Sequence, residues 1–240
     1  MKAKERHHLK QNDVAATAAR LLEGLSTHQS LIGKILAGVV VVALLVGGVM
    51  IWRGRQADRA GEQLGIALAL LEATIAPAPT IPGATQAAGT FPSEQARAAA
   101  ALAAFQKVAA EYPSTDAGIA ARYHAAGELM TLGRLAEAEQ AFQKVAVDAG
   151  SSIYGPMARL GLAEATFAAG KYDESIETFT ALSAERDGAL PVDGVLMQLA
   201  RVCLKAGKTD EARAAFKRVV DEFPDSVYLA DARQRLTALN

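Results

Sequence analysis

Cysteine, histidine and aromatic residues are scarce in this 240-residue chain, and neither sign of charge prevails. The single cysteine, Cys203, excludes a disulfide framework and a cysteine-based metal site, and a lone thiol suits a cytosolic or a periplasmic location equally. Lysine plus arginine number 25 and aspartate plus glutamate 26, which leaves a formal net charge of -1. A protein that follows a phosphate backbone needs a basic face, so this balance argues against a nucleic-acid partner.

The chain also lacks an arrangement of residues suited to catalysis. His124 is the single histidine between residues 93 and 240, so that region contains no pair of nucleophile and base. Cys203 falls at a packed helical position, where a small buried thiol is the ordinary interpretation. The paired carboxylates at 173–174 and 210–211 follow turns and suit helix N-termini electrostatically. We therefore predict that the protein is not an enzyme and holds no metal or cofactor.

One long uncharged run interrupts a chain whose abundant alanine otherwise indicates helix. It extends from Ile35 to Trp52, and eighteen residues in a helix cover roughly 27 Å, about one hydrocarbon core. We predict a transmembrane helix over residues 31–52, with the ammonium of Lys34 reaching back to the headgroups. A cleavable signal peptide is disfavoured, because more than thirty residues precede the run and no A-x-A site follows it closely.

Basic residues are more numerous before this run than after it. Six lysines or arginines precede it and three follow soon after, which favours a cytoplasmic N-terminus and a translocated remainder. Residues 1–30 are a basic tail, in which residues 12–25 carry one apolar helical stripe after a cap at Asn12 or Asp13. Two interpretations of the tail stay open: an amphipathic helix on the inner leaflet, or an unstructured segment that sets the topology.

The rest of the chain repeats with a period of 37 residues. The string AFQKVA begins at Ala104 and again at Ala141, and the related AFKRVV begins two periods later at Ala215. Glycines and phenylalanines keep the same step, at Gly133, Gly170 and Gly207 and at Phe105, Phe142, Phe179 and Phe216. Because glycine ends a helix at low conformational cost, each unit is predicted to be a helix, a glycine turn and a second helix.

These units divide the chain after the span into three parts. Residues 53–75 are predicted to be a juxtamembrane helix that begins the first hairpin. Residues 76–92 are a Pro/Gly-rich insert in which four prolines and two glycines argue against a regular element. Residues 93–240 hold the repeats and end in a capping helix that starts near Asp225 or Ser226 and has a charged outer face. The predicted class is all-α: an N-terminal transmembrane helix, then an α-solenoid of helical hairpins with a C-terminal capping helix.

The pattern within each unit resembles the tetratricopeptide repeat (TPR). Each first helix has a small residue at the same point, and this residue lets the second helix approach closely. These residues are Ala126, Ala163 and Ala200. The glycine turns and the phenylalanines match as well, as do Tyr172, Ala138 or Ala212, and Pro113 or Pro224. The period is three residues longer than is usual in the family, and the family's early tryptophan is absent. The resemblance implies a stack of hairpins that binds other proteins.

First-helix positions line the concave groove in a stack of this kind. Methionine and aromatic residues there provide an adaptable apolar surface, and Arg201 with Lys205 suits a carboxylate. The alternative is that most of these residues pack between hairpins or against the capping helix. The candidate groove residues are Tyr123, Met130, Met157, Leu160, Glu164, Phe167, Met197, Arg201, Leu204 and Lys205.

The order of tail, span, Pro-rich break and repeat array resembles the YfgM-type ancillary subunits of the SecYEG translocon and the related CpoB-like TPR family. That resemblance implies a periplasmic domain, anchored in the bacterial inner membrane, which contacts Sec translocon subunits or periplasmic chaperones. Two other functions stay open. One is a scaffold for cell-envelope assembly or division. The other is a membrane subunit that oligomerises through small-xxx-small spacings such as Gly33 to Ala37, without a groove ligand.

Overall fold

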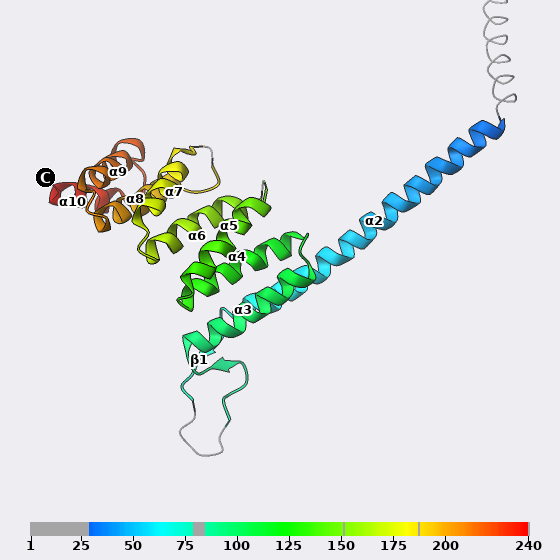
Figure 1. Cartoon of the computed structure of the whole chain (residues 1–240), viewed down its shortest axis with the longest axis horizontal. Coiled ribbons are helices and arrows are strands. Elements are labelled where there is room, and N and C mark those ends of the chain that lie inside the picture. The colour runs from blue at the N-terminus through cyan, green and yellow to red at the C-terminus, as the bar shows by residue number, and fades with distance from the viewer. Residues whose placement is uncertain (1–28, 79–84, 151, 187, 240) are drawn as a thin grey trace, which may run out of the picture. The chain divides into compact units, whose positions relative to one another are not determined.

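The structure is a computed structural model that describes residues 29–78, 85–150, 152–186 and 188–239. It divides into two units, one up to Arg55 and one from Gln56 onward, and we describe each by itself. The predicted amphipathic segment at residues 12–25 lies outside the described residues, with most of the basic tail. Figure 1 labels the helices and strands of the described part.

Helix α2 runs without a break from Gln29 to Ala69. Its part from Leu36 onward is long and apolar enough to cross a membrane. The large apolar side chains of the predicted span are exposed, with Leu44 at 70%, Met50 at 68% and Trp52 at 61%. A helix that is apolar on all sides and uncovered by protein requires an apolar surrounding. The predicted span and the beginning of the predicted juxtamembrane helix are thus parts of one helix.

A short strand pair brackets the Pro/Gly-rich segment. Strands β1 (Thr74–Ile75) and β2 (Thr90–Phe91) pair in parallel, with Thr74 opposite Thr90. The side-chain amide of Gln86 donates to the carbonyl of Ala76 at 2.9 Å and to the Thr90 hydroxyl at 2.7 Å. The prediction of no regular element in this segment is wrong at that edge, because strands of two residues carry no periodic signal in the sequence.

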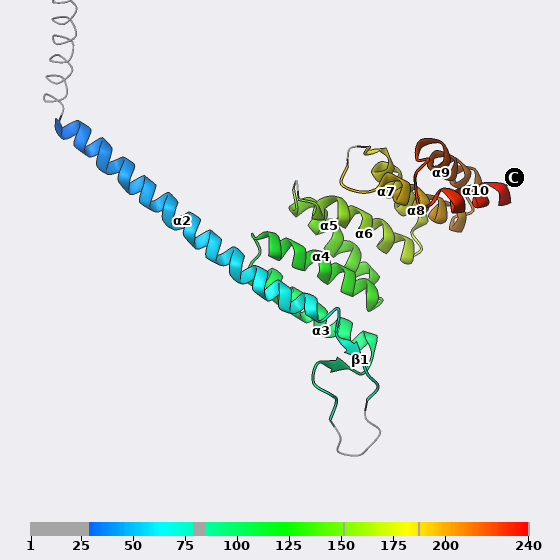
Figure 2. The same ribbon diagram turned by 180° about the vertical axis from the view of Figure 1, so that it is seen from behind.

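Helices α3 to α10 follow one another as antiparallel neighbours, and each packs against the next (Figures 1 and 2). The predicted α-solenoid of hairpins with a terminal capping helix is therefore confirmed. The first helices of the hairpins include α4, α6 and α8, and their second helices include α3, α5, α7 and α9. The bounds are α3 Glu94–Glu111, α4 Asp116–Thr131, α5 Leu135–Asp148, α6 Tyr154–Ala168, α7 Tyr172–Ala184, α8 Val192–Lys205, α9 Thr209–Glu222 and α10 Leu229–Ala238.

The three periodic glycines make the turns inside the hairpins, as predicted. Gly133, Gly170 and Gly207 have φ angles of 71°, 77° and 76°, in the left-handed region. At the second turn the N–H of Gly170 donates to the Phe167 carbonyl at 3.0 Å, and the following N–H donates to the carbonyl of Thr166 at 2.9 Å. The other two turns have the same pair of bonds, so each of these helices ends in a Schellman motif.

The capping helix begins later than predicted. Helix α10 starts at Leu229 rather than near Asp225 or Ser226. The Ser226 hydroxyl donates to the carboxylate of Asp193 at 2.6 Å and accepts the Tyr228 N–H at 3.0 Å. Ser226, near which the helix was predicted to start, therefore ties the preceding loop to α8 instead.

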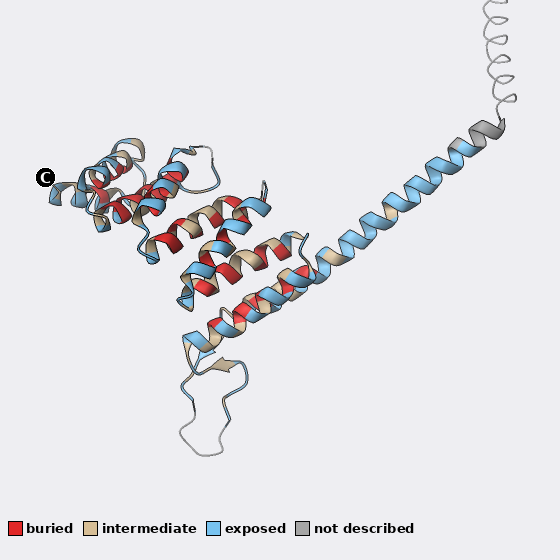
Figure 3. Ribbon diagram, in the orientation of Figure 1, coloured by how far each residue is buried: buried red, intermediate tan, exposed pale blue. Residues whose placement is uncertain are grey.

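The core of the repeat domain consists of the periodic phenylalanines against the periodic alanines. Ala126, Ala163 and Ala200 are fully buried, and the phenylalanines at 105, 142, 179 and 216 are at most 3% exposed. Figure 3 shows buried residues along the faces where neighbouring helices meet. The buried residues form two clusters, one from the end of α2 to α6 and the other from α6 to α10. Both clusters include residues of α6.

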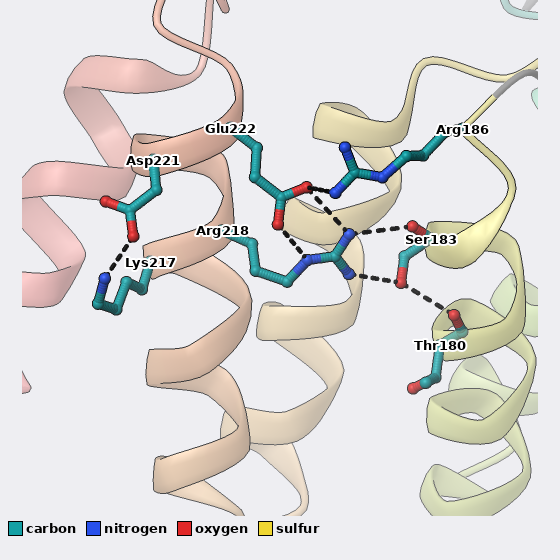
Figure 4. A network of polar contacts seen from close by, with 7 residues as sticks. All are labelled: Thr180, Ser183, Arg186, Lys217, Arg218, Asp221 and Glu222. Carbon is teal, nitrogen blue, oxygen red and sulfur yellow. Dashed lines mark hydrogen bonds and ion pairs between the residues drawn. The ribbon is translucent and has the colours of Figure 1, made fainter.

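A polar network joins α9 to the end of α7 (Figure 4). The Arg218 guanidinium donates to the hydroxyl of Ser183 at 3.1 Å and to its carbonyl at 3.2 Å. Glu222 accepts from Arg218 at 2.9 Å and from Arg186 at 2.9 Å. Because Ser183 is only 1% exposed, this network satisfies polar groups that would be costly to leave unpaired. It links one hairpin to the next.

Candidate functional site

The ten candidate groove residues all lie on α4, α6 and α8, the first helices of three successive hairpins. None of them is fully buried: Arg201 and Lys205 are exposed, and the other eight are partly exposed. Met130 packs against the first core cluster and Leu160 against the second, whereas Met157 is part of neither. The structure thus gives packing contacts to most of these side chains and still leaves each with an accessible surface.

A cavity of about 490 Å³ opens where α8 faces α10. Four candidate residues line it, namely Met197, Arg201, Leu204 and Lys205. The other lining residues are Gln198, Phe216, Tyr228, Asp231 and Arg235. Tyr228, Asp231 and Arg235 come from the capping region. The sequence predicts that Asp231 and Arg235 lie on the charged outer face of the capping helix. The repeat pattern does not indicate that these two side chains border a cavity.

The cavity combines an apolar floor with an excess of positive charge. Met197, Leu204 and Phe216 contribute the apolar surface. Three cationic side chains and one carboxylate line the rim, and that carboxylate, Asp231, accepts from Arg235 at 3.2 Å. Such a lining suits an anionic group attached to an apolar one.

Arg201 is held at the edge of the cavity by an aromatic ring of the preceding hairpin. Its guanidinium carbon lies 5.2 Å from the centroid of Phe167, a cation–π distance. Phe167 in turn lies 5.8 Å from the ring of Tyr172. Burial raises the pKa of Glu164, one turn before Phe167, and the nearby charge of Arg201 opposes that rise. Arg201 therefore connects α6 and α8 electrostatically.

An aromatic cluster occupies the other end of the candidate surface, between α4 and α6. The Tyr123 ring lies 5.6 Å from Tyr154 and 5.8 Å from Phe142. Burial raises the pKa of the Tyr123 hydroxyl, and the carboxylate of Glu164 raises it further. His124, beside Tyr123, stacks on a buried phenylalanine, and burial lowers the pKa of its imidazole. Tyr154 was not among the predicted residues, because it begins α6 and lies outside the repeating pattern.

The described residues hold no group of three or more histidine, cysteine, aspartate or glutamate side chains placed to bind a metal. Cys203 is buried, and burial with the nearby Glu211 raises the pKa of its thiol to about 11. A protonated, buried thiol is a poor nucleophile.

Successive helix–turn–helix hairpins with accessible first helices define an α-solenoid repeat protein of the kind that recognises other proteins. The profile of the tetratricopeptide repeat-like domain family matches residues 29–240, and the chain belongs to that family. No curated sequence is significantly similar to it.

Solved structures share the fold. Two crystal structures of nearly identical TPR-like repeats, from a Podosopora anserina protein designated a kinesin light chain, superpose with TM-scores of 0.57. Their sequences are 16% and 15% identical to this one. Both alignments cover 76% of this chain, and they cover 85% and 86% of the two crystallised chains. At this level of identity the similarity shows the fold alone.

Proposed function

We propose that the protein is a membrane-tethered scaffold that binds a polypeptide segment along α4, α6 and α8. The observation that carries this proposal is the cavity of about 490 Å³, which four of the ten candidate residues line. Family membership supports a protein partner, since stacked hairpins present extended surfaces for such contacts. The partly exposed Tyr123, Glu164 and Phe167 extend the surface from the cavity towards α4.

The anchor in this proposal is α2, with its N-terminus in the cytoplasm and the repeat domain on the far side of the membrane. The exposed apolar surface from Leu36 to Trp52 supports insertion, and the excess of cations before the span supports the orientation. A cysteine introduced at the exposed Lys107, in a Cys203→Ala background, tests it in intact spheroplasts. We expect a membrane-impermeant maleimide to label this cysteine in intact spheroplasts. Labelling only after lysis would show the opposite orientation.

The proposed role is ancillary to protein translocation or to periplasmic chaperone traffic at the bacterial inner membrane. The resemblance of the whole arrangement to the YfgM-type subunits supports it. The test is purification of the full-length protein in mild detergent, with quantitative mass spectrometry against a control that carries only residues 1–55. Enrichment of translocon subunits or periplasmic chaperones is expected. Enrichment of division or envelope-assembly proteins without them would replace this role with the alternative scaffold.

A charge reversal separates a groove binder from a subunit that merely oligomerises. Arg201→Glu changes the rim of the cavity, whereas Lys107→Glu changes an exposed residue of α3. Loss of co-purifying partners with the first variant and retention with the second supports the groove. If neither variant changes the recovery of partners or the oligomeric state, the result would favour a subunit that oligomerises through its transmembrane helix.

A further inference from the structure

The two ends of the candidate surface carry opposite charge. At the α4–α6 end, the rings of Tyr123 and Tyr154 lie 5.6 Å apart, close to the carboxylate of Glu164. Glu164 is partly buried and makes no ion pair with any residue that the structure describes. A cationic side chain is the group that interacts favourably with aromatic faces and a carboxylate together.

The α8–α10 end presents the opposite chemistry. Within the described ranges Arg201 and Lys205 form no ion pair, and both are exposed at the rim of the cavity. Arg235 adds a third cation there, although it also contacts Asp231. A carboxylate at this rim would gain charge-assisted hydrogen bonds while its apolar neighbour contacts Met197 or Leu204.

The distance between the two ends follows from the helical stack. Packed helices lie about 10 Å apart, so the single step from Glu164 on α6 to Arg201 on α8 amounts to roughly 10 Å. An extended chain advances about 3.3 Å per residue, and about three residues therefore span that length. Arg201 lies along this path, where its charge attracts Glu164 and its guanidinium rests on Phe167.

We propose that the groove selects a dipolar polypeptide segment, in which a cationic side chain and a carboxylate are about three residues apart. The cation lies against Tyr123, Tyr154 and Glu164, and the carboxylate lies at the rim formed by Arg201 and Lys205. This inference rests on the proposed function and specifies its ligand. The basis is charge complementarity: each end carries charge that the described part of the protein leaves without a counter-ion within ion-pair distance.

The test uses fluorescent peptides of one length and one apolar composition that differ at two positions three residues apart. These positions hold Lys and Glu in either order, Lys twice, Glu twice or Gln twice. Binding to the full-length protein in detergent is measured by fluorescence anisotropy at low salt. A Lys/Glu peptide is expected to bind about five-fold more tightly than the like-charged peptides. The order of Lys and Glu that binds more tightly also shows the direction in which the bound peptide runs along the groove.

Exchanging the charge of one end should exchange the preference. Glu164→Lys is expected to make the Glu/Glu peptide the best ligand, and the double variant Arg201→Glu/Lys205→Glu to make the Lys/Lys peptide the best. Lys107→Glu serves as the matched control and should leave the order of affinities unchanged. Circular dichroism checks that each variant is folded. If Glu164→Lys does not fold, Glu164→Gln replaces it and should abolish the advantage of Lys over Gln at the first position.

The outcomes separate this inference from the proposed function. Equal binding of all the peptides, sensitive to Arg201→Glu, would overturn charge selection and leave a groove binder. An advantage of the Lys/Glu peptide that survives both charge exchanges would also overturn the assignment of the two ends. If no peptide binds, both the inference and the proposed groove fail.

Discussion

The glycine turns allow a clean measurement of what a left-handed residue contributes to this fold. Replacing Gly133, Gly170 or Gly207 with alanine places a side chain on a backbone with φ between 71° and 77°. A Cβ at any of these positions would meet no atom within 4 Å, so the cost comes from the backbone conformation and not from a clash. The left-handed conformation costs an alanine about 1–2 kcal/mol, and reduced freedom in the unfolded chain offsets part of that.

We expect each substitution to lower the free energy of unfolding by about 1 kcal/mol. In a domain of this size, that loss lowers the melting temperature by about 2–4 °C. The three losses should be similar, because the turns share the same conformation and the same pair of hydrogen bonds. The assay is thermal and urea unfolding of the full-length protein in detergent, followed by circular dichroism.

Gly127 is the matched control, because it lies within α4 in a helical conformation and a Cβ there would likewise meet no atom within 4 Å. Gly127→Ala should raise the free energy of unfolding by about 0.5–1 kcal/mol, since alanine loses less entropy than glycine on entering a helix. The two classes of substitution thus differ in sign. Turn variants as stable as the wild type, or a control that loses as much as they do, would refute the reasoning.

Three further substitutions or treatments test the core, the polar network and the buried thiol. Phe179→Ala removes a fully buried ring and should cost about 3–5 kcal/mol in urea unfolding; a loss below about 1 kcal/mol would contradict close packing. Arg218→Ala should cost about 1–2 kcal/mol because the Ser183 carbonyl loses the Arg218 donor and the bond to Glu222 is lost, whereas Lys217→Ala, at an exposed pair with Asp221, should change stability by less than about 0.5 kcal/mol. Because its thiol pKa is about 11, native Cys203 should resist iodoacetamide at about pH 8 and react once urea unfolds the chain. The unfolded thiol ionises at lower pH than the folded one, so this residue's contribution to stability falls as the pH rises from 9 towards 11. Rapid native labelling would place the thiol at the surface.

The hairpins could be predicted because one physical requirement recurs in each of them. A left-handed turn selects glycine, and a close helix contact selects alanine opposite phenylalanine, so Gly170, Ala163 and Phe179 mark a complete unit. The uncharged run likewise predicted a helix long and apolar enough to span a membrane. Both signals come from residues whose local surroundings dictate their type.

The features that could not be predicted depend on which segments meet in space. The sequence predicted a helix start near Asp225 or Ser226, but the Ser226 hydroxyl bonds Asp193 of another helix, and α10 begins at Leu229. The periodic pattern indicates which face of α8 carries Arg201. It does not indicate that Tyr228 and Arg235 approach that face, because α8 and α10 are not consecutive helices.

Helix α6 belongs to both core clusters, through Ala158 and Ala165 on one side and Ala163 on the other. Disrupting the packing of either cluster must therefore disturb α6. The same helix carries Glu164 and Phe167. A polypeptide bound there would raise the free energy of unfolding the packing on both sides of α6, so binding to the surface and stability of the repeat domain are linked.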